Sequence, residues 1–104
     1  MEPFKIDFDA LPWESPADSV RFKIYREGTK QCRLLEFTSE FVELHWCEKE
    51  HVGFVLNGEL EVDFRGKLVR YPEGTAICIP AGPDSGHKAR AVSPTVRLFL
   101  VEDA

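Results

Sequence analysis

The residues best suited to metal chemistry stand close together in one short stretch, HWCEKEHVGFVLNG, which spans residues 45–58. They are His45, Cys47 and His51, and the third histidine of the chain, His87, ends a second stretch, GTAICIPAGPDSGH. Imidazole and thiolate suit zinc, iron, nickel and copper, whereas magnesium and calcium prefer oxygen ligands. The residue types therefore point to one divalent transition-metal ion, and the two stretches must meet in space to hold it.

The alternation of apolar and polar residues predicts that the three histidines face one interior. In FVELHWC, His45 and Cys47 share one side of a strand with Glu43, and in HKARA the small alanines share the side of His87. A buried imidazole without a partner costs about 1–3 kcal/mol. For a single inward histidine, a hydrogen-bonded structural role is the commoner explanation. A shared metal explains three of them together.

Short strands are the elements that must position these residues. Turn residues separate segments rich in β-branched and aromatic side chains, and no segment has a sustained helical period. This pattern predicts an all-β sandwich or barrel. We expect an N-terminal arm or edge strand over residues 1–19 and a single barrel domain over residues 20–104. The predicted strands are 20–25, 31–38, 41–46, 51–56, 59–64, 67–71, 75–79, 87–92 and 95–101.

The Asn-Gly pair at 57–58 predicts how the strand that begins at His51 pairs with the next one. Asn-Gly is typical of a two-residue type I′ hairpin, because both positions of that turn need a positive φ. In this register Val55 lies opposite Leu60, and His51 lies opposite Phe64. His51 is therefore expected on the face that carries the core.

The Arg-Gly pair at 65–66 predicts a second hairpin, which sets Val62 opposite Val69. One face of the three strands then holds an apolar set: Val55, Leu60, Val62, Phe64, Val69 and Tyr71. The opposite face is half apolar and half acidic, with Val52, Phe54 and Leu56 beside Glu59, Glu61 and Asp63. A face of this kind is often partly solvated and partly covered, for example by a second subunit.

The composition excludes several classes of protein. At 104 residues the chain forms one domain, and 43% hydrophobic with 30% charged residues is ordinary for a folded protein. A net charge of -5 gives no electrostatic reason to bind nucleic acid or a membrane surface. Three widely spaced cysteines form no disulfide framework, which favours a reducing cytoplasm. Cys32 and Cys78 are predicted to be small buried hydrophobic residues.

The two metal-capable stretches resemble the motifs of the cupin superfamily, over residues 31–101. The first motif is present as His45-x-Cys47-x3-His51-x6-Gly58, with cysteine in place of the second histidine and histidine in place of the glutamate. The second is present as Gly74-x5-Pro80-x-Gly82-x4-His87, two residues longer than usual before the histidine. The glycine that opens the first motif and the asparagine that closes the second are absent. Each altered ligand position still carries a residue that binds metals.

The resemblance implies a double-stranded β-helix barrel, jelly-roll-like, of the small single-domain cupin-2 type. It also implies a homodimer, because many cupins are homodimers, and this would account for the half-apolar outer face. It implies one metal ion (Zn, Fe, Ni or Cu) at the mouth of the barrel, with His45, Cys47, His51 and His87 as ligands. If Cys47 binds the metal, four ligands complete a tetrahedron and leave no place for a substrate. If it does not, a three-histidine centre stays open, as in the thiol dioxygenases of this superfamily.

Two functions follow from the sequence. The first is a metal-dependent, oxygenase-type enzyme that acts on a small organic substrate. The alternative is a non-enzymatic module that binds a metal or a small ligand. A metal-free cupin is a weaker possibility, because histidines persist at shifted motif positions. Glu43 is the candidate for a residue that supports the metal ligands or serves as a reserve ligand. Tyr71 is a candidate for the wall of a pocket, although packing in the core is the commoner role of such a residue.

Overall fold

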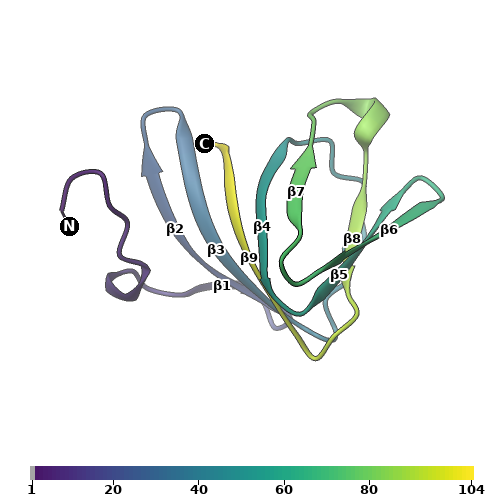
Figure 1. The fold of residues 1–104 in the computed structure, drawn as a ribbon, viewed down its shortest axis with the longest axis horizontal. Helices are drawn as coiled ribbons and strands as arrows, with labels where there is room; N and C mark the ends of the chain where they lie inside the picture. Colours follow the sequence, from purple (N-terminus) through teal and green to yellow (C-terminus); the bar gives the residue numbers. More distant parts are fainter. Residues whose placement is uncertain (1) are drawn as a thin grey trace.

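In the computed structural model, which describes residues 2–104, two antiparallel sheets face each other and diverge toward one end (Figure 1). The six-stranded sheet runs in the order β1 (Glu14–Ala17), β2 (Val20–Glu27), β3 (Lys30–Thr38), β9 (Thr95–Asp103), β4 (His51–Asn57) and β7 (Ala76–Ile79). The three-stranded sheet runs in the order β6 (Lys67–Pro72), β5 (Glu59–Phe64) and β8 (Lys88–Ala91). The only helices among the described residues are two 3-10 turns, η1 (Phe8–Ala10) and η2 (Pro83–Ser85). The predicted all-β fold is confirmed.

The core lies between the two sheets. Val55 and Val96 of the large sheet and Val62 of the small one are almost completely buried. The predicted inward face is confirmed, since Leu60 and Val62 are buried and Phe64 and Tyr71 pack against the core. The other buried apolar residues are Leu35, Phe37, Ile77, Ile79, Ala89, Ala91, Leu98 and Leu100.

The 57–58 turn does not form the predicted hairpin. Strand β4 pairs with β7 and β9, and β5 pairs with β6 and β8, so the predicted pairing of β4 with β5 is wrong. A type I′ turn needs a positive φ at both positions, but only Gly58 has one (+79°). Gly58 carries the chain from one sheet to the other past β9. A Cβ atom there would lie 2.0 Å from the carbonyl oxygen of Thr95.

The 65–66 turn forms the predicted hairpin. Arg65 and Gly66 both have positive φ values, 53° and 107°, as a type I′ turn requires. The register is the predicted one, with Val62 opposite Val69. The turn residues therefore predicted the correct register here, where the two flanking strands belong to one sheet.

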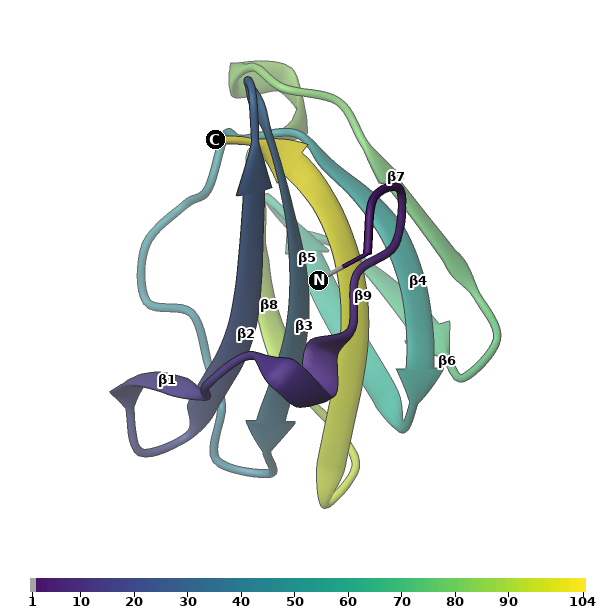
Figure 2. The ribbon, with the colours of Figure 1, turned by 90° about the vertical axis from the view of Figure 1, so that its left-hand side faces the viewer.

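The N-terminal segment lies across the outer face of the six-stranded sheet (Figure 2). The Phe8 ring meets the Phe99 ring of β9 edge-on at 6.1 Å, and its carbonyl oxygen accepts a hydrogen bond from Lys23 Nζ at 2.8 Å. Strand β1 then adds to the edge of the sheet beside β2. A division of the chain at residue 19 stays a prediction.

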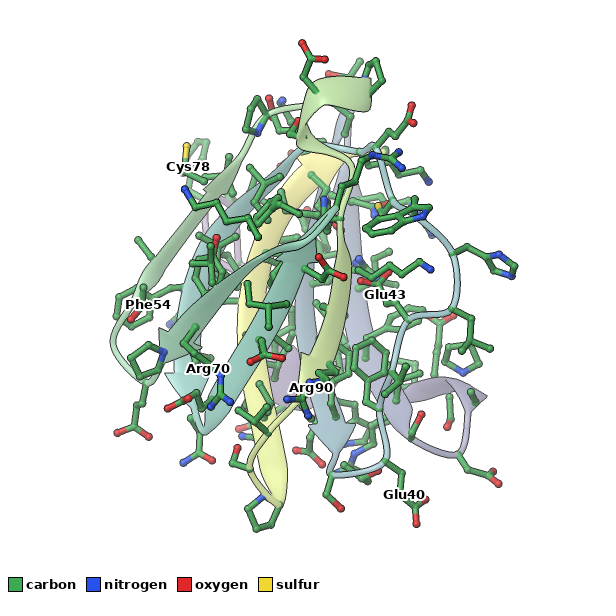
Figure 3. The ribbon with its side chains drawn as sticks, turned by 90° about the vertical axis from the view of Figure 1, so that its right-hand side faces the viewer. Glu40, Glu43, Phe54, Arg70, Cys78 and Arg90 are labelled. Atoms are coloured by element: carbon green, nitrogen blue, oxygen red, sulfur yellow. The ribbon has the colours of Figure 1, made fainter. Side chains whose placement is uncertain are left out.

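Acid is expected to weaken the outer face of the three-stranded sheet through Glu61. Hydrogen bonds from Arg70, at 2.6 Å, and Arg90, at 2.7 Å, hold the pKa of Glu61 below its ordinary value of 4.5 (Figure 3). A carboxyl with a lowered pKa stabilises the fold above its unfolded pKa, and that stability is lost as the pH falls through the folded pKa. Glu61→Gln should therefore lower the melting temperature at pH 7, and the gap to wild type should close toward pH 3.

The control for this prediction is Glu40→Gln, because Glu40 is exposed and its side chain forms no ion pair or hydrogen bond within residues 2–104 (Figure 3). Thermal unfolding followed by circular dichroism gives the melting temperatures. A gap between Glu61→Gln and wild type that stays constant from pH 7 to pH 3 would contradict the electrostatic explanation.

Candidate metal centre

Cys47 and His87 meet because residues 41–47 run antiparallel to the segment that leads into β8. The backbone N–H of Cys47 donates to the His87 carbonyl at 2.8 Å, and the N–H of His87 donates to the Cys47 carbonyl at 2.9 Å. Two residues that exchange both hydrogen bonds carry their side chains on the same face of a ladder. The thiol and the imidazole therefore project together, and His87 is 2% exposed.

The predicted strand over residues 41–46 is reduced to isolated bridges, at Val42 and Cys47. Glu43 explains the interruption. Its side-chain Oε1 accepts the Ala89 N–H at 2.9 Å, the donor that a regular ladder would give to the backbone carbonyl of Glu43. The chain then bulges outward before it returns at Cys47. Regular alternation, on which the predicted strand rested, is lost in this segment.

His45 lies on this bulge and is exposed, as are its neighbours Leu44 and Trp46. Its predicted inward orientation is wrong, because alternation holds only in an unbroken strand. The geometry does not bring His45 to the other candidate ligands. Trp46 instead packs beneath Arg65 and Lys88, whose cationic groups lie 4.6 and 4.4 Å from its ring centroid.

Cys47, His51 and His87 form a compact group of possible ligands. Their candidate ligand atoms all lie within 4.8 Å of one another. Cys47 Sγ is 3.5 Å from His51 Nε2, and the two imidazole rings are 5.2 Å apart at an angle of 76°. Three of the four predicted ligands are thus brought together, from the 41–47 segment, the start of β4 and the segment before β8.

Hydrogen bonds to Nδ1 orient both imidazole rings. His51 Nδ1 lies 2.9 Å from Glu102 Oε2, and His87 Nδ1 lies 3.0 Å from the Ser85 carbonyl oxygen. A carbonyl oxygen and an ionised carboxylate only accept hydrogen bonds, so in each ring Nδ1 carries the proton and donates. In a neutral ring the lone pair is then on Nε2. Both rings are prepared to bind a metal through Nε2.

Glu102 is a site residue that the sequence did not reveal. Its side chain is only 8% exposed and accepts hydrogen bonds from His51, from Arg33 and from Gln31. Burial raises the pKa of Glu102, but the hydrogen bonds from His51, Arg33 and Gln31 outweigh it and lower the pKa to about 2. Glu102 is therefore ionised at neutral pH. A carboxylate behind a metal-binding histidine fixes its tautomer and raises its basicity.

The three ligands stand between two hollows. A cavity of about 220 Å³ lies inside the barrel and is lined by His87, His51, Arg33, Glu43 and the half-buried Tyr71 as well as by apolar core residues. Burial raises the pKa of the Tyr71 hydroxyl. A second hollow at the rim is lined by Cys47 and shares His51, Arg33 and Glu43 with the cavity. An ion held by the three residues would thus be accessible from the rim and from the interior cavity.

The donor set fits a transition-metal ion. Zinc lies about 2.3 Å from a thiolate and about 2.0–2.1 Å from an imidazole nitrogen, so two such ligands of a tetrahedral ion are roughly 3.5 Å apart. The 3.5 Å between Cys47 Sγ and His51 Nε2 matches this separation. One sulfur and two nitrogens also exclude magnesium and calcium on chemical grounds. With His45 on the outside, the set offers three protein ligands, so a tetrahedral ion bound there would keep a fourth position open.

Two further cysteine predictions are corrected. Cys78 is exposed, because β7 carries it on the outer side of the large sheet opposite Val52 of β4 (Figure 3). Cys32 is half-buried rather than fully buried. Neither belongs to the group of candidate ligands among the described residues. Ser85, in the 83–86 loop before His87, contacts the His87 ring through its carbonyl oxygen.

Comparisons with known proteins identify the fold. No family model and no curated protein matches the chain. Among solved structures, it is similar to KdgF from Halomonas sp., with 23% identity, a TM-score of 0.75 and coverage of 92% of this chain and 91% of that one. A cupin-superfamily sugar phosphate isomerase from Silicibacter pomeroyi has 14% identity and a TM-score of 0.78, with coverage of 96% and 75%.

A cupin-2 domain protein from Rhodospirillum rubrum has 17% identity and a TM-score of 0.72, with coverage of all of this chain and 78% of that one. The predicted resemblance to the cupins is therefore confirmed at the level of the fold, a double-stranded β-helix barrel. No helix within residues 2–104 has the length and hydropathy to cross a bilayer.

Proposed function

We propose that this cupin-fold chain is a metal-dependent enzyme that acts on a small organic substrate, with one divalent transition-metal ion bound by Cys47, His51 and His87. The observation that carries the proposal is the orientation of the two imidazoles. Each has its Nδ1 occupied by an oxygen acceptor, His51 Nε2 lies 3.5 Å from Cys47 Sγ, and the candidate ligand atoms of all three residues lie within 4.8 Å of one another. Closed structural zinc sites have four protein ligands, whereas catalytic sites have three and keep one position open.

The roles of the chain's own residues follow from their contacts. Glu102 and the Ser85 carbonyl hold the two rings in the tautomer that binds a metal. Glu43 has one carboxylate oxygen bonded to the Ala89 N–H, and its other oxygen is free to accept a proton from a bound molecule. When bound, the metal supplies Lewis acidity and lowers the pKa of bound water. The apolar barrel keeps bulk water away from that chemistry.

The finer assignments stay proposals. Zn, Fe, Ni or Cu all suit the donor set, and an oxygenase-type reaction is one that iron or copper would support. We place the protein in the cytoplasm, because its three cysteines are free and free thiols persist in a reducing compartment. The non-enzymatic alternative differs in one respect: a bound small molecule would be released unchanged.

Elemental analysis of untagged protein tests the proposal, together with visible spectra after cobalt substitution. We expect about one transition metal per chain and a cobalt spectrum with a thiolate-to-metal band that disappears in Cys47→Ser. Loaded protein should consume a substrate, with oxygen uptake if the reaction is of the oxygenase type. A protein that holds no metal and takes up none of Zn, Fe(II), Ni or Cu would refute the metal centre.

A second candidate function has a specific observation in its favour. Cys47, His51 and Glu102 make contacts in the order of a Cys–His–acid catalytic triad, 3.5 Å and 2.9 Å apart. His87 favours the metal over the triad, because a triad does not need a second buried imidazole beside the sulfur. If the triad is correct, the Cys47 thiol of metal-free His87→Ala should still be alkylated rapidly by haloacetamides. If the metal centre is correct, added zinc should protect the Cys47 thiol from alkylation in wild type but not in His87→Ala.

We propose that two copies of the chain associate through the outer face of β4 and β7. Val52, Phe54 and Leu56 of β4 are 43%, 42% and 43% exposed, a contiguous apolar stripe on a single strand. The acidic residues expected on the same face belong to β5 and lie on the outer side of the other sheet, so the β4 stripe is more uniformly apolar than predicted. Cys78 adjoins the stripe (Figure 3). Exposed apolar surface of this kind marks contact sites.

Phe54→Asp is expected to convert a dimer into a monomer, because it buries a charge in the apolar contact. Size-exclusion chromatography with light scattering gives the mass. The matched control is Leu68→Asp, since Leu68 is a 61%-exposed apolar residue on the opposite sheet and should leave the mass unchanged. Wild type that is monomeric at every soluble concentration would contradict the proposed dimer.

A further inference from the structure

The cavity inside the barrel is polar at one end and apolar elsewhere. Its charged and imidazole groups, which are Arg33, Glu43, His51 and His87, come from the strand ends and segments near the rim. The remainder of its wall is made of Tyr71 and aliphatic or phenyl side chains from both sheets. A ligand in this space must therefore place its polar groups beside the metal ligands and bury a hydrocarbon body below them.

The volume sets the size of that body. The cavity measures about 220 Å³. An apolar cavity of about 150 Å³ in another protein accommodates benzene. The barrel thus has room for a branched alkyl chain or an aromatic ring. A sugar would leave several hydroxyl groups against hydrocarbon, each without a hydrogen-bond partner.

Arg33 is placed to bind an anionic group at the polar end. Its Nε and Nη2 atoms donate to the two carboxylate oxygens of Glu102, which also holds His51. The third nitrogen, Nη1, has no hydrogen-bond partner within residues 2–104. Every buried side-chain nitrogen of these residues has a hydrogen-bond partner, so Nη1 is not buried and is accessible to a ligand. Arg33 lines both hollows. Its position is fixed by Glu102, so an anion that meets Nη1 is held at low entropic cost.

Glu43 determines which chemical group of the ligand can lie next to its anionic group. Among residues 2–104 it is the only acidic one in the wall of the inner cavity, and one of its oxygens is open to accept a hydrogen bond. A plain carboxylate would be repelled by Glu43. A carboxylate with a neighbouring hydroxyl or amino group would donate to Glu43 and accept from Arg33.

We infer that the ligand of this site is a small carboxylate with a hydroxyl or amino group on the adjacent carbon and a hydrocarbon side chain. The inference deepens the proposed function and rests on it for the metal beside His51 and His87. The carboxylate meets Arg33 Nη1, the donor meets Glu43, and the hydrocarbon fills the barrel. The likeness to a sugar phosphate isomerase of the same fold does not extend to the ligand.

The test is a titration of cobalt-loaded protein, followed by the visible spectrum and by calorimetry. The probes are 2-hydroxy-4-methylpentanoate and leucine, with 4-methylpentanoate, which lacks the donor, and galacturonate, which lacks the hydrocarbon, as comparisons. We expect saturable binding of at least one of the first two, and binding at least about tenfold weaker for both comparisons. Arg33→Lys should weaken binding roughly tenfold or more while the cobalt spectrum without ligand is unchanged. Arg90→Lys, which alters an arginine paired with Glu61 on the outer face, should have no effect.

The outcomes separate this inference from the proposed function. If cobalt binds but neither 2-substituted acid does, or if galacturonate binds more tightly than both, the ligand class is wrong and the metal centre stands. If Arg33→Lys binds the acids as tightly as wild type does, the role of Arg33 is wrong. If cobalt does not bind at all, the proposed function itself fails.

Discussion

His51→Ala is expected to release the metal from the protein, whereas His45→Ala should leave metal binding unchanged. His51 Nε2 lies 3.5 Å from Cys47 Sγ and belongs to the three-ligand group, while His45 is exposed on a bulge. Loss of a residue that merely supports a ligand weakens metal affinity about 10–100-fold. Loss of one of three ligands should exceed the upper end of that range. Competition with a chromophoric chelator, measured on both variants, gives the affinities.

His45→Ala is also the matched control, because it removes an imidazole only six positions away in the sequence. Circular dichroism of the metal-free proteins shows whether either variant has lost its fold. If His45→Ala releases the metal as readily as His51→Ala, the four-ligand set of the sequence analysis is right. The 44–46 bulge would then have to turn inward when the metal binds.

The sequence predicted the candidate site well where strands are regular and poorly where they are not. Cys47 and His87 were expected to meet, and they form a directly paired bridge. The prediction that the His45 side chain points inward was wrong, because the pairing register shifts between Val42 and Cys47. From the bridge at Val42 to the bridge at Cys47 the chain advances five positions, while its partner moves only three, from Arg90 to His87. Two extra residues on one segment make a bulge, and alternation does not reveal a bulge.

The same limit applies to the fold. Turn chemistry correctly placed the 65–66 hairpin, because the flanking strands β5 and β6 are neighbours in one sheet. The 57–58 pair has equally favourable residues, yet it joins strands of opposite sheets. The outcome depends on long-range pairing: β4 bonds to β9, and the paired residues lie 40 to 49 positions apart in the sequence. Local propensity carries no information about that partner.

Glu102 could not have been found from the sequence for a related reason. It lies 51 positions after His51, outside both metal-capable stretches, on the last strand of the sheet. Only the pairing of β9 with both β3 and β4 brings its carboxylate between Arg33 and His51. A glutamate near the end of a strand that alternates apolar and polar residues reads as a solvated charge. Its burial is a consequence of topology.

Glu102→Gln is accordingly expected to weaken metal binding by about 10–100-fold without removing a ligand. The amide still offers His51 Nδ1 an oxygen, but it lacks the negative charge that raises the basicity of the imidazole. It also leaves Arg33 without its ionic partner, so the guanidinium beside the site is no longer fixed. The same chelator competition measures the affinity. The cobalt spectrum should keep its thiolate band at saturating metal, because Cys47 is unchanged.

Glu36→Gln separates this effect from the general cost of a broken ion pair. Glu36 lies on β3 opposite Arg97 of β9, and its carboxylate is also held by two arginines, Arg21 and Arg97. Within residues 2–104 it forms no hydrogen bond or ion pair with a histidine. Its substitution should lower the melting temperature and leave metal affinity at the wild-type value. Equal losses of affinity in both variants would mean that Glu102 acts only through the stability of the sheet. A loss confined to Glu102→Gln can arise only through the imidazole that this carboxylate orients and the guanidinium that it holds beside it.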